Sequence, residues 1–276
     1  ANRAKDEFLA ILGHELRNPL GAISAGIEVL NRISPEGDQP ARMRQIISRQ
    51  TRHLARLMDD LLDVARVIAG KIQLSVHPVS VRATVQRVVN TFKITGLTQA
   101  VEIDVDDVWV QADSVRLEQI INNLITNAGK YSPPDLVIQV IAKAHGPVVR
   151  LQVINHGPLI PPTLLPHIFD LFVQGERTIE RRQGGLGIGL TLVKSLVDLH
   201  HGKVEVSTSD DRNIFTVELP AAQPDERAAS ESPGLATHRR RVVIVEDNDD
   251  AREAVQLMLE VGGHEVIAHT DGDMGL

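Results

Sequence analysis

A heptad pattern in residues 43–68 constrains the fold of this chain more than any other feature. Apolar side chains recur there at alternating steps of four and three residues, and the polar Gln50 interrupts the pattern once. This spacing is typical of a helix whose seam packs against a partner helix. The series comprises Met43, Ile47, Gln50, Leu54, Leu57, Leu61, Val64 and Ile68. We expect the helix to end near Ala69, with Gly70 as its stop signal.

A similar apolar stripe precedes it and predicts a first helix. Its members are Phe8, Leu12, Leu16, Leu20, Ile23, Ile27 and Leu30. The turn-forming segment Ser34–Pro40 separates the two stripes, which predicts an antiparallel hairpin. A single hairpin leaves much of both stripes in water, so we predict a homodimer joined through a four-helix bundle. An alternative is that the helical hairpin serves only to dimerise the protein.

Residues from about 75 to 219 change character and predict an α+β fold, with helices layered on one mostly antiparallel sheet. The expected strands are Val101–Val105, Val108–Gln111, Leu136–Ala142, Val148–Ile154, Val204–Ser207 and Ile214–Leu219, and the expected helices are Val81–Phe92, Ser114–Ala128 and Leu190–His201.

Composition excludes several classes of protein. The net charge of -7 over 276 residues argues against a general affinity for nucleic acid or anionic lipid. The chain has no cysteine, which excludes disulfides and thiolate metal sites. No apolar run has membrane-spanning length. We expect a cytoplasmic chain without membrane contact. We also expect it to be a fragment excised from a longer protein.

His14 lies outside the apolar stripe of the first helix. It is two residues from both Leu12 and Leu16, about 200° around the helix from each, so we expect it to face water. Most such histidines are ordinary surface residues. Here Glu15 follows directly, and Pro19 is expected to kink or loosen the helix beside it.

The run Phe8–Leu20 resembles the H-box of sensor histidine kinases. That resemblance implies that His14 is the phosphoacceptor and that Glu15 polarises its imidazole as a general base. It also implies that Asn18 orients water in the reverse, phosphatase reaction. An exposed imidazole with a carboxylate on its other ring nitrogen suits nucleophilic attack on phosphorus.

The segment Asp113–Tyr131 resembles the N-box of the same family. Asn123 and Asn127 lie one turn apart on one helix face, where amide oxygens can hold Mg²⁺ beside phosphates. The resemblance implies that Asn127 is the Mg²⁺ ligand, that Asn123 and Lys130 face the phosphates of ATP, and that Tyr131 lines the adenine site. Related gyrase-type and chaperone ATPases carry a Glu at the place of Asn123, so hydrolysis is disfavoured here.

A glycine run, Gly184–Leu190, leads straight into a helix. Alternating glycines let a backbone approach an anion at a helix N-terminus. The run resembles the second glycine box of the family, which implies nucleotide contacts from Gly185, Gly187, Gly189 and Leu190. Arg177, Arg181 and Arg182 would belong to a lid, and Ile168–Phe172 resembles the F-box.

The first glycine box of the family departs from its usual Asp-x-Gly-x-Gly pattern. It reads Asn155-His-Gly-Pro-Leu159, so Asn155 would meet the adenine amino group without a charge, beside Gly157. Leu159 stands where a glycine would permit positive φ. Ser209–Asn213 replaces a Gly-rich turn.

The tail is expected to be a linker followed by the start of another domain. The strand Arg240–Val245 ends in the acids Glu246 and Asp247, and a helix and a second strand, Glu265–His269, follow. This resembles the opening of a flavodoxin-like receiver domain, too short to bury a core.

These interpretations combine into one prediction. We expect a dimerisation and phosphotransfer hairpin (1–72), a Bergerat-type α/β sandwich that binds ATP (75–221), a linker (222–239) and a receiver fragment (240–276). The resemblance implies an ATP- and Mg²⁺-dependent autokinase that passes phosphate from His14 to a receiver aspartate. The alternative is a pseudokinase, phosphatase or dimeric binding module with weakened ATP binding.

Overall fold

The protein is described by a computed structural model, which covers residues 2–32, 38–95, 99–171, 173, 187–224 and 240–270. It divides into two compact units, Ala1–Asp225 and Glu226–Leu276.

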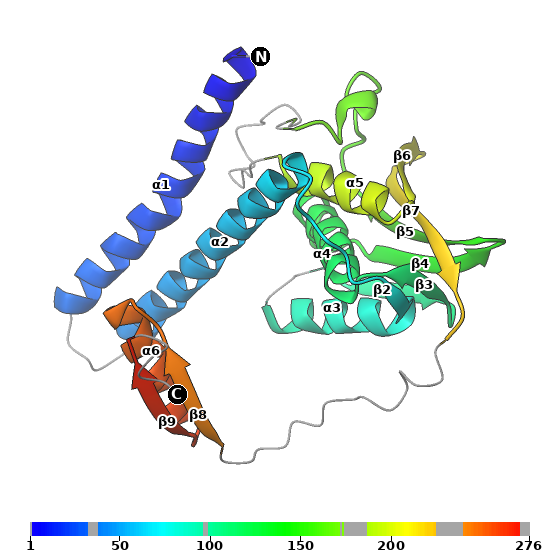
Figure 1. Cartoon of the computed structure of the whole chain (residues 1–276). Helices are drawn as coiled ribbons and strands as arrows, with labels where there is room; N and C mark the ends of the chain where they lie inside the picture. The colour runs from blue at the N-terminus through cyan, green and yellow to red at the C-terminus, as the bar shows by residue number, and fades with distance from the viewer. Residues whose placement is uncertain are drawn as a thin grey trace. The chain divides into compact units, whose positions relative to one another are not determined.

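The first unit begins with two long helices that pack side by side, α1 (Asn2–Arg32) and α2 (Asp38–Ile68) (Figure 1). α1 runs as one helix through Pro19, and the kink or loosened turn expected beside this proline stays a prediction. α2 begins at Asp38, earlier than predicted. Pro40 therefore lies in its first turn, where the missing N–H of proline costs no helical hydrogen bond.

A seven-stranded sheet forms the centre of the rest of this unit. Its strands are β1 (His77–Ser80), β2 (Val101–Val105), β3 (Trp109–Ala112), β4 (Ile138–His145), β5 (Val148–His156), β6 (Lys203–Ser209) and β7 (Arg212–Ala222). They run in the order β1-β3-β7-β5-β4-β2, and β6 also pairs with β7. The β2–β4 pair is parallel and the others are antiparallel, which confirms the predicted α+β class.

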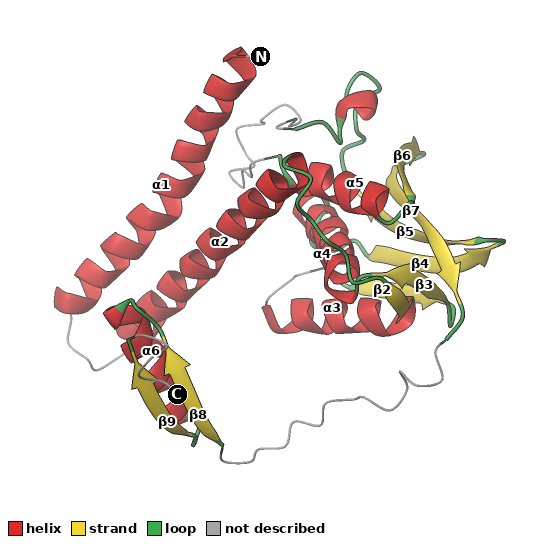
Figure 2. Ribbon diagram, viewed as in Figure 1, coloured by secondary structure: helices red, strands yellow, loops and turns green. Residues whose placement is uncertain are grey.

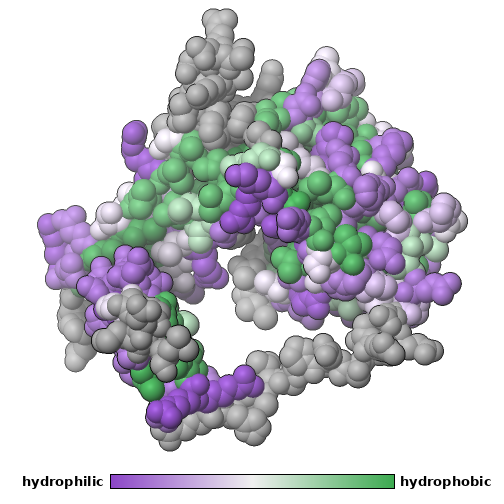
Figure 3. Space-filling view, in the orientation of Figure 1, coloured by the Kyte–Doolittle hydropathy of each residue, from purple (hydrophilic) through white to green (hydrophobic). Residues whose placement is uncertain are grey.

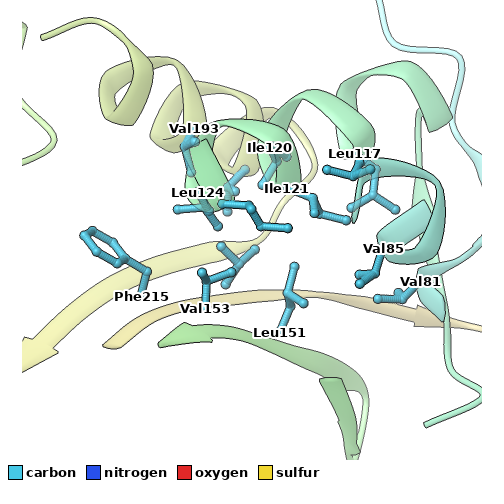
Figure 4. Packing of buried hydrophobic residues seen from close by; sticks show 14 of the residues in the cluster. Val81, Val85, Leu117, Ile120, Ile121, Leu124, Leu151, Val153, Val193 and Phe215 are labelled. Atoms are coloured by element: carbon cyan, nitrogen blue, oxygen red, sulfur yellow. The ribbon is translucent and has the colours of Figure 1, made fainter. Parts of the chain in front are cut away.

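Three helices cover one face of this sheet (Figures 1 and 2): α3 (Val81–Thr95), α4 (Ser114–Tyr131) and α5 (Gly189–Leu199). A short 3₁₀ turn, η1 (Leu165–His167), precedes α5. The core lies between these helices and the sheet, with α4 at its centre (Figure 4). α4 buries Leu117, Ile120, Ile121, Leu124, Ile125 and Ala128, the spacing of one helix face.

Asp113 caps the N-terminus of α4. Its Oδ1 accepts from the backbone N–H groups of Val115 at 3.0 Å and Arg116 at 3.1 Å, and its Oδ2 accepts from Ser75 N at 2.9 Å. Burial by itself would raise the pKa of Asp113. The three backbone hydrogen bonds and the charge of Arg116 outweigh it and hold the pKa below its ordinary value of 3.8.

A buried polar cluster joins the hairpin to α4. Asp63 of α2 is 7% exposed, and its Oδ2 accepts from Arg116 Nη1 at 2.8 Å and from Gln119 Nε2 at 2.7 Å. Arg116 Nη1 also donates to Gln119 Oε1 at 2.8 Å. Because the carboxylate is charged and buried, loss of either partner would leave it incompletely compensated.

The second unit is a small βαβ fragment. It consists of β8 (Arg241–Val245), α6 (Asp249–Val261) and β9 (Glu265–His269), and the two strands are parallel. No residue of α6 is buried, and Met258 and Val261 are 66% and 81% exposed. A fragment of this size does not enclose a core of its own, as expected.

Most elements lie where the sequence predicts them, with ends shifted by a few residues. β1 was not predicted. No helix in the described part of the chain is both long and apolar enough to cross a bilayer.

Replacing Asp113 with Ala is expected to lower the free energy of unfolding by about 1 kcal/mol at pH 7, because three N–H groups lose their acceptor. Since the folded-state pKa lies below the unfolded value, this contribution is fully present above about pH 5. It is lost as the pH falls through the folded-state pKa. Urea unfolding of both proteins between neutral and acidic pH measures the difference. The exposed Asp107→Ala variant is the control, and a loss independent of pH would contradict this account.

Candidate active site

The predicted site residues of α4 share its polar face. Asn123 and Asn127 lie one turn apart and are half-buried, opposite the apolar face that packs on the sheet. Asn123 Nδ2 is buried and has no hydrogen-bond partner among the described residues. The core packing of α4 thereby fixes where these two amides point.

The N-terminus of α5 approaches the same helix face. A Cβ added to Gly189 would lie 3.7 Å from Asn123 Oδ1, so the two residues are neighbours. Gly187 has φ +68, a conformation that suits glycine. Ile188 is the N-cap of α5 and supplies no side-chain cap, and Leu190 packs partly against the core. The first N–H groups of α5 are thus suited to an anion. Gly185 lies outside the described residues.

The C-terminal end of α4 meets the end of β5. A Cβ on Gly157 would stand 2.2 Å from the carbonyl oxygen of Tyr131 and 3.6 Å from Asn155 Nδ2. Asn155 is 2% exposed, and in the described part of the chain its Nδ2 has no hydrogen-bond partner. Glycine at 157 is therefore a packing requirement that brings Asn155 and Tyr131 together.

Lys130 and Tyr131 form the outer part of this junction. Lys130 Nζ lies 5.2 Å from the centroid of the Tyr131 ring, within the range of a cation–π contact. Tyr131 remains 38% exposed. A cation and an aromatic face are therefore available between the two asparagines of α4 and Asn155.

Asn213 holds the loop that follows Asn155. Its Nδ2 donates to the Pro158 carbonyl at 3.1 Å, and its Oδ1 accepts from Ile160 N at 3.0 Å. Asn213 is 2% exposed and pairs with Asn155 in the β5–β7 register. The amide thus fixes the loop from the neighbouring strand.

The backbone of this region differs from expectation at one point. Leu159 is 45% exposed and is not among the residues with positive φ, so the expected strain is absent there. In the turn between β6 and β7, Asp210 adopts φ 53. Asp tolerates this conformation better than most residues, which explains how the turn forms without glycine.

Sequence reasoning did not identify Asn213 as part of the site. The sequence did contain a sign that Asn213 is buried. On β7, Asn213 lies on the same face as the buried residues Phe215, Val217 and Leu219, because every second residue of a strand points to the same side. An Asn side chain that points into the core needs hydrogen-bond partners. The partners here are backbone atoms of a loop distant in sequence.

The phosphoacceptor candidates lie on α1. His14 and Glu15 belong to the continuous helix, but their side chains lie outside the description; Asn18 is exposed. These three residues lie on α1, whereas the amides of the candidate site lie on α4. Arg177, Arg181 and Arg182 also fall outside the described residues. Phe169, in the segment that resembles the F-box, packs partly against the core.

The polar residues of this site suit a hard divalent cation that takes most of its oxygen ligands from a bound phosphate compound and from water. In the described ranges no group of three or more His, Asp and Glu side chains could hold a metal ion. The half-buried amide of Asn127 offers one neutral oxygen ligand. This donor set suits Mg²⁺ bound together with phosphates, because Mg²⁺ keeps much of its shell from water and substrate.

Two family models match the chain. Residues 4–70 match the His Kinase A (phospho-acceptor) domain, and residues 112–223 match the histidine kinase-, DNA gyrase B- and HSP90-like ATPase.

Similar proteins carry histidine kinase names. The circadian input-output histidine kinase CikA of Synechococcus elongatus is 32% identical over all of this chain and 38% of its own length. The probable sensor histidine kinase TcrY of Mycobacterium tuberculosis is 32% identical over 78% of this chain and 45% of its own. The chain thus spans less than half of these relatives. The crystal structure of full-length ShkA in complex with AMPPNP has a TM-score of 0.57 at 27% identity, covering 98% of this chain and 56% of that one.

Substituting Ala for Gly157 is expected to cost about 1–3 kcal/mol of folding free energy, because the added methyl group would meet a backbone carbonyl. Gly189→Ala is the matched control, since its methyl group would find ordinary contact at 3.7 Å. Denaturant unfolding compares the two variants. Equal stabilities would contradict the close approach of Gly157 to Tyr131.

Proposed function

Because the chain belongs to the sensor histidine kinases, we propose that it is an ATP-dependent protein-histidine autokinase that phosphorylates His14. The carrying observation is that buried amide nitrogens of Asn123 on α4 and Asn155 on β5, which have no hydrogen-bond partner among the described residues, occur together with Lys130 and the glycine-containing start of α5. Buried donors without partners are costly, and a nucleotide can satisfy them. Such an amide-lined site suits phosphoryl transfer, in which positioning and charge stabilisation do most of the work.

In the proposed complex, the phosphates of ATP lie along α4 and the start of α5. Asn123 and Lys130 donate to phosphate oxygens, as do backbone N–H groups near Gly187 and Gly189. Asn127 holds Mg²⁺, which when bound neutralises charge on the transferred phosphoryl group. Leu190 secures the first turn of α5 against the core.

The base occupies the other end of the site. Tyr131 offers an aromatic face, and Asn155 offers an uncharged amide beside Gly157. Neither Tyr131 nor Asn155 carries a positive charge that would attract phosphate, whereas the N-terminus of α5 attracts anions. The base therefore binds at the α4–β5 junction and the phosphates near α5.

The transfer step forms one bond and breaks one. A neutral nitrogen of His14 attacks the γ-phosphorus, and the bond from that phosphorus to the β,γ-bridging oxygen breaks, releasing ADP. Glu15 accepts the proton of the other ring nitrogen, which stabilises the developing imidazolium charge. Asn18 orients water in the reverse, phosphatase reaction.

We further propose that the protein acts as a homodimer. Leu20 and Ile27 of α1 and Met58 and Leu62 of α2 are 46–52% exposed in a single chain. Figure 3 shows apolar surface over these helices. A second hairpin would bury these side chains in a four-helix bundle.

The phosphate then passes to an aspartate of a receiver domain in the cytoplasm. The βαβ fragment supports a receiver on the same protein, with Glu246 and Asp247 at the end of β8 as candidate Mg²⁺ ligands. In the proposed hybrid kinase, His14 serves as the phosphate donor for this receiver.

One observation favours a second function. Asn155 lacks the charge by which the family's carboxylate binds adenine, so the chain could instead be a pseudokinase or a phosphatase that relies on Asn18. The next experiment separates the two functions.

Incubation of this chain with Mg²⁺ and γ-labelled ATP is expected to give acid-labile, alkali-stable label, because a phosphorus–nitrogen bond hydrolyses in acid. The label should vanish in His14→Gln and persist in His145→Gln, a control in the exposed β4–β5 turn. A folded wild-type chain that retains no label would favour the pseudokinase or phosphatase. Label that survives in His14→Gln would place the phosphoacceptor elsewhere.

The double variant Leu20→Glu/Ile27→Glu is expected to weaken dimerisation by more than about 100-fold, since two apolar side chains lose their burial. Sedimentation velocity over a concentration series measures this. Val115→Glu is the control, because this apolar residue is 69% exposed on α4. Identical dimerisation of both variants would exclude this face as the dimer interface.

A further inference from the structure

We propose that Asn155 lets the site accept 6-oxopurine nucleoside triphosphates, such as GTP and ITP, beside ATP. This inference rests on the proposed function, because it assigns the substrate class of the same site. It starts from a single atom: Asn155 Nδ2 is a buried donor for which the described protein supplies no acceptor. A buried amide hydrogen without a partner is costly, so a ligand acceptor at this position would be favoured.

The surroundings of Asn155 indicate that the acceptor belongs to a base and not to a phosphate. Its Nδ2 lies at the junction of Gly157 and the Tyr131 carbonyl, at the aromatic end of the site. The N-terminus of α5 attracts the phosphates beside Asn123, about two helical turns along α4 from Tyr131. The part of a nucleotide left for Asn155 is the polar edge of its base.

An amide and a carboxylate select bases differently. A carboxylate only accepts, so one that faces position 6 of a purine favours the amino group of adenine and repels a 6-oxo group. An amide offers one donor and one acceptor side by side. It can accept from the adenine amino group while donating to N1, or donate to a 6-oxo group while accepting from N1–H.

Asn155 can make either choice because its donor is not committed within the protein. Asn213 provides the contrast, since both of its polar atoms are bound to the loop backbone at Pro158 and Ile160. That bracing keeps the loop beside Asn155 in place, so the base edge meets a fixed wall and an amide whose donor has no acceptor among the described residues. Selectivity between 6-amino and 6-oxo purines is therefore low.

The test measures binding of ATP, GTP, ITP and CTP, each with Mg²⁺, to the full chain by isothermal titration calorimetry. The variants are Asn155→Asp and the control Gln152→Glu, which adds the same charge to β5 at a side chain bonded to Thr216. We expect ATP, GTP and ITP to bind the wild type within about tenfold of one another. Asn155→Asp should raise the preference for ATP over GTP by at least about tenfold, whereas Gln152→Glu should leave it unchanged.

The outcomes separate this inference from the proposed function. ATP binding with GTP at least about 100-fold weaker in the wild type would overturn the inference and leave the kinase intact. An equal shift of the ATP-to-GTP ratio in both variants would also overturn it, because general charge would then be the cause. If the wild type binds no nucleotide, the proposed function fails together with the inference. CTP binding as tight as GTP binding would exclude purine-edge recognition.

Discussion

The burial of one face of α4 is the constraint on which the rest of the structure depends. Six side chains of this helix are packed into the core, and this packing leaves the helix no rotational freedom. Asn123 and Asn127 consequently point to one side, where the start of α5 arrives, while Tyr131 meets Gly157 at the helix end. The same helix begins at the Asp113 cap and carries the Arg116 that binds Asp63. The candidate nucleotide site and the contact with the hairpin are therefore two sides of a single rigid element.

The altered first glycine box has a structural counterpart in the neighbouring strand. Without a charge at position 155, the proposed base end would depend more on shape and on a correctly held loop. Asn213 supplies that hold with two hydrogen bonds to the loop backbone, from a position that pairs directly with Asn155. The turn that precedes Asn213 adopts positive φ at Asp210 without a glycine. The departures from the family pattern thus lie together in space, which suggests one adapted base-binding wall.

Periodicity predicted the two long helices and most strands, because alternating burial on a sheet and heptad burial on a helix leave a direct trace in sequence. It did not predict β1, since a four-residue edge strand containing Pro78 has neither the length nor the composition of a strand. The amides of α4 were recognisable by their spacing. The roles of Asn213 and Asp63 were not, because each depends on partners far away in the chain. Long-range polar contacts leave no periodic signal, and local patterns predict only that such a residue needs a partner.

The most direct test of the central claim is a crystal structure of this chain with Mg²⁺ and a non-hydrolysable ATP analogue. The account predicts that the phosphates lie between Asn123, Asn127 and the start of α5, with the purine edge within hydrogen-bond distance of Asn155. Nucleotide bound elsewhere, or a base that makes no contact with Asn155 while the phosphates occupy α4, would contradict the site as it is assigned.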